Sequence, residues 1–231
     1  MASRSVGAGW HRTVMDSLTG SQIEDAGLAD WRKLAQALHA RFRHDDPAAA
    51  AAFVTGVVAL AGPGGRMPEV RLQTGVVDVV VATHVDGVWV TAGDVEVARS
   101  VSRLAAEHRL RPHPEEVAQV ELALDTADGG AQGRFWAALL TGSSDNQVVD
   151  TVFDPTGRVP SLWFQPTEPH DPPRQRWHLD VWVAPEAAPG RIAAAVAAGG
   201  TVLYDAGNGS VTILRDPEGN RVCVCSSRGR E

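Results

Sequence analysis

Val120-Glu121-Leu122-Ala123 and Trp177-His178-Leu179-Asp180 share a pattern, in which a polar side chain stands at the second position of an apolar strand. The spacing that follows each stretch is also shared: from Glu121 to Gln165 is 44 positions, and from His178 to Cys223 is 45. Both copies continue with an Ala-rich helix and with strands around an Asp-Pro-x-Gly turn. This duplication predicts two βαβββ units, which can close as half-barrels around one cleft.

Apolar periodicity and turn residues give the bounds that we predict for the elements of each copy. The first copy is predicted to have a strand over 117–125, a helix over 130–140, and strands near 148–153 and 161–165 around the turn at 154–157. The second is predicted to have a strand over 176–183, a helix over 187–198 ending at a Gly pair, and strands over 201–204, 211–214 and 222–225, with its turn at 216–219.

The first half of the chain shows no such repeat and is predicted to be a separate α+β domain. Its clearest strand is the β-branched run at 76–83, and a second strand is expected over 31–44. Helices are expected over 21–28, from Pro47 to Ala61, and over 95–107 behind a capping box. We therefore predict a flexible tail at 1–20, a first domain at 21–109, a Pro-containing linker at 110–116 and a second domain at 117–231.

Composition excludes several classes of function. The formal net charge of −7 argues against nucleic acid or an anionic membrane as partner, and 44% apolar residues are typical of a globular protein. The sequence has neither a bilayer-spanning apolar stretch nor the apolar core of a signal peptide. Cys223 and Cys225 are two positions apart on one predicted strand, so their side chains diverge and a disulfide is not expected. These features predict a cytoplasmic protein.

Two side chains of the first domain could take part in proton transfer. His84 ends a predicted buried strand next to a loop, where an imidazole can exchange a proton near neutral pH. The alternative is a histidine that is hydrogen-bonded to its own turn. Asp94 likewise has a structural explanation, as the third residue of a helix that its carboxylate stabilises.

Residues 21–108 resemble the pterin-4a-carbinolamine dehydratase family. The resemblance rests on Trp31, Ala51-Ala52-Phe53-Val54, Pro68-Glu69, the pair Thr83-His84 at 16 positions from Pro68, and Thr91 with Asp94. It implies a four-stranded antiparallel sheet with helices on one face, assembly into dimers or higher oligomers, and removal of water from a 4a-hydroxytetrahydropterin such as 4a-hydroxytetrahydrobiopterin. That lyase reaction requires an acid and a base but no cofactor.

The chain departs from the family pattern just before Pro68. The family has two histidines there, whereas this chain has Arg66 and Met67, and the family's aromatic residue six positions after the proline is Thr74. Arginine does not act as a general base in proteins. The resemblance implies catalytic roles for His84 and Asp94, the two residues that keep their family identities. In the catalytic site that we predict, His84 moves protons, Asp94 shapes the pocket, Arg66 contacts an acidic or carbonyl group, and Glu69 contacts substrate. A weakened enzyme, a pterin-like binder and a structural dimerisation module all remain open.

In the second domain, one Glu and one His stand at equivalent positions of the two copies. Glu121, His178 and either Gln165 or Cys223 facing one cleft could hold a divalent metal with positions left for substrate. The alternative is a polar cleft that binds no ion, with Cys223 as a small core residue. Trp136 and Trp163 could stack on a flat substrate, although indoles of this kind are more often part of a core.

Residues 117–227 resemble glyoxalase-like domains of the vicinal oxygen chelate superfamily. The resemblance rests on Phe135-Trp136, Pro160-Ser161-Leu162-Trp163-Phe164-Gln165, His178-Leu179-Asp180-Val181 and Asp216-Pro217-Glu218-Gly219-Asn220. Metal-binding members place ligands at the positions of Glu121, Gln165, His178 and Cys223, and other members bind antibiotics without a metal.

Together, these observations predict a dehydratase-like lyase with an appended glyoxalase-like domain that binds a small, pterin-like or heteroaromatic molecule. The first domain is expected to need no cofactor, and the second can take a divalent metal. We expect a homodimer or larger oligomer, with neither nucleic acid nor membrane as partner. The alternative is a protein of the glyoxalase-like type, metal-dependent or non-catalytic, that binds or transforms a planar metabolite or antibiotic while the first domain serves oligomerisation.

Overall fold

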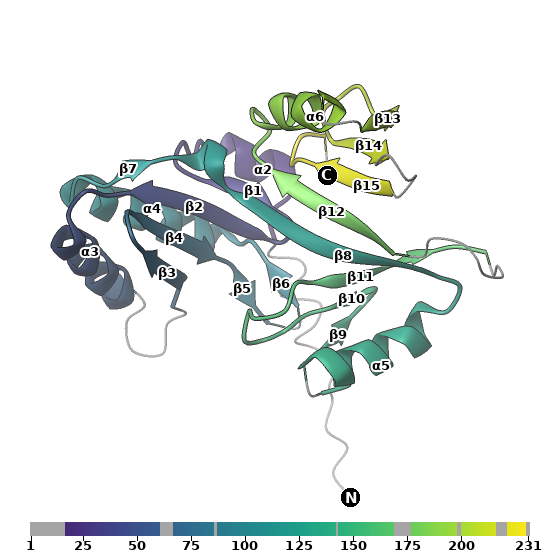
Figure 1. Cartoon of the computed structure of the whole chain (residues 1–231). Helices are drawn as coiled ribbons and strands as arrows, with labels where there is room; N and C mark the ends of the chain where they lie inside the picture. Colours follow the sequence, from purple (N-terminus) through teal and green to yellow (C-terminus); the bar gives the residue numbers. More distant parts are fainter. Residues whose placement is uncertain are drawn as a thin grey trace, which may run out of the picture. The chain divides into compact units, whose positions relative to one another are not determined.

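The computed structural model describes residues 17–60, 67–85, 87–141, 143–168, 177–197, 200–215 and 221–229. The chain folds as two compact units that divide between Val117 and Ala118 (Figure 1). Within the described residues, no helix is both long and apolar enough to cross a bilayer. Each unit is described separately below.

The first unit is an antiparallel sheet with helices on one face. Its strands follow the order β1-β2-β4-β3, and the short β7 pairs with β2. The separate pair β5–β6 leads into the last helix. Its elements are α2 (Gly20–Asp25), β1 (Arg32–Leu34), β2 (Ala37–Arg43), α3 (Pro47–Leu60), β3 (Glu69–Gln73), β4 (Val76–Val81), β5 (Thr83–His84), β6 (Val88–Trp89), α4 (Ala92–Glu107), β7 (Arg111–Pro112) and the 3₁₀ turn η1 (Pro114–Glu116).

Alternation along β2 and β4 explains why the helices lie on one face. The side chains of Leu38, Ala40 and Phe42 are buried, as are those of Val77, Val79 and Val81. They pack against α3 and α4 in one core, and each large apolar side chain buried there contributes about 1.5–3 kcal/mol. Trp31 belongs to this core and donates its indole N–H to Ser102 on α4, at 3.1 Å. The predicted sheet with helices on one face is confirmed.

Two segments of this unit differ from the sequence-based expectation. The strand expected over 31–44 is a hairpin, because Ala35 takes a left-handed φ of 49° and turns β1 back onto β2. The segment expected as a linker, 110–116, packs on the first sheet. Phe42 pairs with Pro112, and Arg43 forms a bidentate ion pair with Glu116.

The second unit contains two copies of the same order of elements. The first copy is β8 (Ala118–Thr126), α5 (Gly129–Thr141), β9 (Gln147–Val148), β10 (Thr151–Val152) and β11 (Leu162–Pro166). The second is β12 (Trp177–Val183), α6 (Ala188–Ala197), β13 (Thr201–Asp205), β14 (Val211–Arg215) and β15 (Arg221–Cys225). The predicted βαβββ duplication is confirmed. The second predicted turn, at 216–219, lies outside the described residues.

The eight strands of this unit form one sheet in which the two copies are arranged symmetrically. From each edge inward, the strands of a copy follow the order second, third, fourth, first. The full order is β13-β14-β15-β12-β8-β11-β10-β9, with the first strands of the two copies paired at the centre. These central strands, β8 and β12, run antiparallel and bring Asp180 opposite Glu121 and His178 opposite Ala123. In each copy the first strand runs parallel to the last. The duplication therefore places its two polar positions on neighbouring strands.

The helices of the second unit cover one face of this sheet. Leu124, Leu162 and Phe164 pack with residues of α5, and Val183, Leu214 and Val224 pack with residues of α6. Because successive strand side chains point to opposite faces, the other face receives the intervening residues of β8 and β12. This second face, which carries Glu121, Asp125, His178, Asp180 and Trp182, is called the polar face below.

Candidate functional site

In the first unit, the strand pair β5–β6 presents His84 to solvent. Thr83 pairs with Trp89, and His84 pairs with Val88. The side chain of Thr83 is buried, whereas that of His84 is exposed. Adjacent side chains of a strand point in opposite directions, so burial of Thr83 turns the imidazole of His84 outward.

The loop after His84 is held by a close contact between a glycine and an indole. Trp89 Nε1 donates a hydrogen bond of 3.2 Å to the carbonyl oxygen of Val85. Gly87 has a φ of 127°, and a Cβ at this position would lie 2.9 Å from the ring of Trp89. Glycine satisfies both the backbone conformation and the close approach.

Asp94 links this strand pair to the start of α4. Its Oδ2 accepts hydrogen bonds of 2.8 Å from the Thr83 hydroxyl, the Thr91 hydroxyl and the Thr91 backbone N–H. The bond from the Thr91 backbone N–H is one half of a capping box with Thr91 as the cap of the helix. The other half runs from the Asp94 backbone N–H to the Thr91 hydroxyl oxygen, at 3.4 Å. The buried carboxylate therefore fixes the residue that precedes His84.

The remaining residues predicted for this site lie near the same end of the sheet or outside the described part. Glu69 is the first residue of β3, is exposed, and places Oε1 3.8 Å from Arg71 Nη2. It pairs with Val80, close to the end of β4 that leads to His84. Glu69 and His84 thus share one end of the β3–β4 hairpin. Arg66 lies outside the described residues.

A cavity of about 520 Å³ lies at the opposite end of this sheet. Its lining includes His44, Asp45 and Arg111. His44 directly follows β2, and its backbone N–H donates to the Gly75 carbonyl at 3.0 Å. The carboxylate of Asp45 binds Arg111 through two hydrogen bonds, which lower the pKa of Asp45. This cavity does not contain the residues predicted for proton transfer.

In the second unit, Glu121 is buried on the polar face and accepts a hydrogen bond from an indole. Its side chain is 4% exposed, and Oε2 accepts a hydrogen bond of 2.7 Å from Trp182 Nε1. Trp182 lies on β12, next to the strand that carries Glu121. This hydrogen bond joins the side chains of Glu121 and Trp182 on the polar face.

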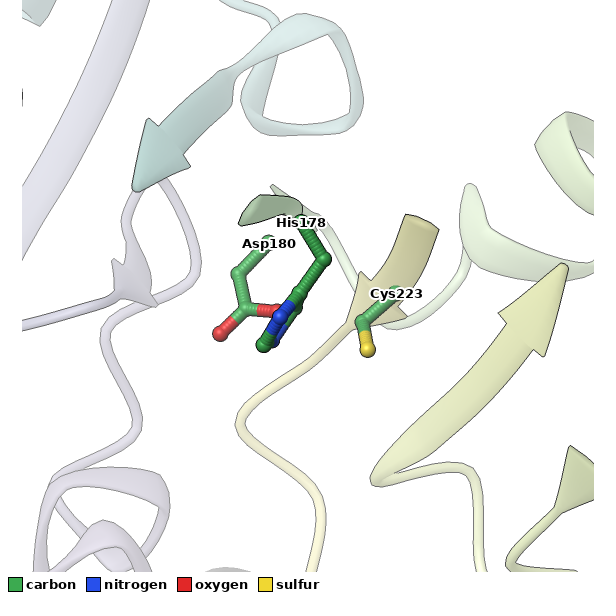
Figure 2. A group of neighbouring side chains, drawn as sticks. All are labelled: His178, Asp180 and Cys223. Carbon is green, nitrogen blue, oxygen red and sulfur yellow. The ribbon is translucent and has the colours of Figure 1, made fainter. Parts of the chain in front are cut away.

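Beside Glu121, the polar face gathers an imidazole, a carboxylate and a thiol. His178 and Asp180 project from β12, Cys223 projects from β15, and their ligand atoms all lie within 4.8 Å of one another (Figure 2). His178 Nε2 is 3.6 Å from Asp180 Oδ1. On the other side of the ring, His178 Nδ1 is 3.5 Å from Asp125 Oδ1. Neither Cys223 nor Cys225 forms a disulfide.

Trp163 reaches across β8 to this cluster. Its Nε1 donates a hydrogen bond of 2.9 Å to Asp180 Oδ2, and its ring lies edge-on to that of His178 with centroids 5.9 Å apart. The residue between them on β8 is Ala123, which pairs with both Trp163 and His178. The small side chain of Ala123 leaves space for this contact.

The metal ligands predicted from sequence are therefore only partly brought together. His178 and Cys223 join the cluster, whereas Glu121 is outside it and Gln165 is exposed on β11. Asp180 takes part as well, although it was not predicted from the sequence. Its position two residues after His178 on a strand is the signal that could have identified it, because such residues share a face.

The predicted aromatic substrate contacts lie on different faces of the sheet. Trp163 lies on the polar face with His178. Trp136 lies on α5, packs with the core under that helix, and contacts Trp177 edge-to-face at 5.3 Å. The two indoles therefore do not line one surface.

Comparison with known proteins gives each unit a separate match. Residues 16–104 match the family model described as "Pterin 4 alpha carbinolamine dehydratase", and residues 121–225 match the one described as "Glyoxalase-like domain". The chain is also similar to a protein of Gloeobacter violaceus named "Putative pterin-4-alpha-carbinolamine dehydratase 2". The two are 34% identical over 93 residues, which make up 38% of this chain and 100% of that relative.

Proposed function

Because this chain belongs to the pterin-4a-carbinolamine dehydratase family through its first unit, which is joined to a glyoxalase-like domain, we propose that it catalyses the dehydration of a 4a-hydroxytetrahydropterin. The single observation that carries the proposal is the placement of His84. Its imidazole is exposed at the end of β5, and the preceding Thr83 is anchored to the buried Asp94. An exposed imidazole on a fixed strand end can serve in proton transfer.

The reaction requires two proton transfers and no change of oxidation state. The bond between C4a and its hydroxyl oxygen breaks, the leaving hydroxyl takes up a proton and departs as water, and a ring N–H gives up a proton. One imidazole can accept the ring proton and return a proton to the hydroxyl, so it ends the cycle unchanged. His84 is the group to which we assign this exchange, and Asp94 positions it through Thr83.

The test is a direct assay on a freshly generated 4a-hydroxytetrahydropterin, followed by absorbance against the spontaneous reaction. We expect His84→Ala to lower kcat by about 10²-fold or more, the usual contribution of a general acid–base group. His108→Ala is the matched control. His108 caps the far end of α4, about 20 Å along the helix from Asp94, and its removal should leave turnover unchanged. Turnover by the unmodified chain no faster than the spontaneous rate, or unchanged in His84→Ala, would overturn the proposal.

A further inference from the structure

We propose that His178, Asp180 and Cys223 form a binding site for a divalent cation of the zinc type on the polar face of the second unit. This site is separate from the dehydratase function assigned to the first unit. It also differs from the ligand set predicted from sequence, because Asp180 takes the place expected for Glu121.

The spacing of the three groups suits a tetrahedral ion. Zinc binds imidazole nitrogen and carboxylate oxygen at about 2.0–2.2 Å, which places two such ligands about 3.4 Å apart in a tetrahedron. His178 Nε2 and Asp180 Oδ1 are 3.6 Å apart. The Cys223 sulfur lies within 4.8 Å of both residues' ligand atoms, so a small side-chain adjustment completes the triangle.

One carboxylate oxygen of Asp180 accepts a hydrogen bond, and the other accepts none from the described residues. Oδ2 accepts the Trp163 indole N–H at 2.9 Å, whereas the buried Oδ1 has no hydrogen-bond partner among the described residues. The residue as a whole is only 5% exposed. A buried carboxylate oxygen without a donor is unfavourable, and a bound cation supplies the missing partner.

His178 is oriented as metal-binding histidines usually are. Its Nε2 faces Asp180, while its Nδ1 lies 3.5 Å from the carboxylate of Asp125. A carboxylate beside the second ring nitrogen selects the tautomer that leaves the first nitrogen free to bind a metal. The edge-on contact with Trp163 restricts rotation of the ring.

The chemistry of the three donors selects the class of ion. A thiolate and an imidazole favour Zn²⁺ and related transition metals, whereas Mg²⁺ and Ca²⁺ prefer oxygen ligands alone. Three protein ligands leave a fourth tetrahedral position for water or a substrate oxygen. Glu121 contributes no ligand in this arrangement, because its carboxylate is bonded to Trp182 and lies outside the cluster.

Zinc titration of the full chain, stripped of metal with a chelator, distinguishes this ligand set from the one predicted from sequence. We expect one equivalent of Zn²⁺ to bind and Mg²⁺ not to compete. Asp180→Asn keeps the shape of the side chain and an oxygen for Trp163, yet should weaken Zn²⁺ binding at least about tenfold, since loss of an outer-shell partner alone costs about 10- to 100-fold. Glu121→Gln should leave the affinity unchanged. The reverse order of the two variants would overturn the assignment, as would absence of zinc binding.

Cobalt substitution tests the thiolate. Co²⁺ bound by a cysteine thiolate gives a charge-transfer band in the near ultraviolet, which we expect for the unmodified chain and for Cys225→Ala. Cys223→Ala should lose the band. Cys225 is the matched control because it lies two residues further along the same strand. A band retained in Cys223→Ala excludes Cys223 as a ligand and overturns the proposal.

A third measurement needs no substitution and so does not depend on whether a variant folds. The unmodified chain is treated briefly with iodoacetamide with and without Zn²⁺, and labelling is quantified by mass spectrometry. We expect Zn²⁺ to protect Cys223, which is partly exposed, by tenfold or more, and Mg²⁺ to give no protection. Equal labelling of Cys223 with and without Zn²⁺ would overturn the site.

Discussion

Thr83 and Asp94 are joined by a buried hydrogen bond of 2.8 Å between the threonine hydroxyl and carboxylate oxygen Oδ2. The same oxygen closes the capping box at the start of α4. One carboxylate therefore connects the helix to the strand whose next residue is His84. Asp94 has the structural role that its place in the helix predicts, and this role also makes it a positioning group for the proposed site.

Thr83→Val tests this connection, because valine has the same shape without the hydroxyl. We expect a loss of about 1–2 kcal/mol in the free energy of unfolding, the usual cost of disrupting a buried hydrogen bond. We also expect kcat for dehydration to fall about tenfold or more with KM nearly unchanged, since a displaced His84 weakens the chemical step rather than binding. Urea denaturation and steady-state kinetics measure the two effects.

Thr83→Ser is the matched control, because it keeps the hydroxyl that bonds Asp94. It should restore most of kcat even where some stability is lost with the methyl group. A serine variant as slow as the valine variant would show that the hydrogen bond does not position His84.

The pH dependence of stability should carry a contribution from His39. Burial lowers the pKa of His39 to about 4, against the raising effects of Asp78 and of a hydrogen bond to the Leu34 backbone. An unfolded histidine titrates near 6.5, so the unfolded chain takes up a proton that the folded chain does not between these values. Above pH 6.5, His39 is neutral in both states and does not lower the free energy of unfolding. As the pH falls from 6.5 to about 4, the free energy of unfolding decreases by up to about 3 kcal/mol because of this group.

His39→Gln isolates this contribution, since glutamine has no titrating group. Urea denaturation from pH 4 to pH 7.5 should show a smaller loss of stability in acid for the variant than for the unmodified chain. Identical pH profiles would show that His39 is freely protonated in the folded state.

The fold was predictable from sequence where the apolar periodicity agrees with the residues that begin or end helices and turns. The Val76–Val81 strand, the Pro47 helix start and the doubled βαβββ pattern are examples. The hairpin at Ala35 was missed because its turn contains neither Gly nor Asn, the residues that usually mark a left-handed backbone. Pro112 suggested a linker, yet proline is allowed on an edge strand, and β7 is one.

For the candidate sites, the sequence predicted which residues stand at equivalent positions of the strands, but not which of their side chains meet. Position 178 was identified from the repeat, because it is the equivalent of Glu121 in the second copy. The shared face follows from the pairing of β8 with β12. Which of these polar groups meet depends on long-range contacts: Trp182 engages Glu121, and Trp163 holds Asp180. These contacts join residues 61 and 17 positions apart, which no local pattern encodes.

Trp182→Phe should reveal the structural role of Glu121. Phenylalanine keeps an aromatic ring but leaves the buried carboxylate without the indole N–H, and we expect a loss of about 1–3 kcal/mol in the free energy of unfolding. Adding Glu121→Gln should recover part of that loss, because a neutral amide costs less to bury than a carboxylate. Chemical denaturation of the two single variants and the double variant gives the coupling free energy between the two side chains. Strictly additive effects would contradict a direct interaction between the two side chains.

Met67→His should increase dehydration, because it restores one histidine of the family pattern beside Pro68. Met67 is 61% exposed, so the change should alter stability by less than about 0.5 kcal/mol. It immediately precedes Pro68 and β3, whose first residue pairs near the end of β4 that leads to His84, so both histidines would stand at one end of the hairpin. A second acid–base group would let one imidazole take the ring proton while the other protonates the leaving hydroxyl. Such a group contributes about 10²–10⁴-fold when well placed, and we expect kcat to rise at least about tenfold.

Met67→Ala controls for loss of the thioether. The gain should disappear when His84→Ala is added; a gain that survives without His84 would mean that the reaction does not run through His84.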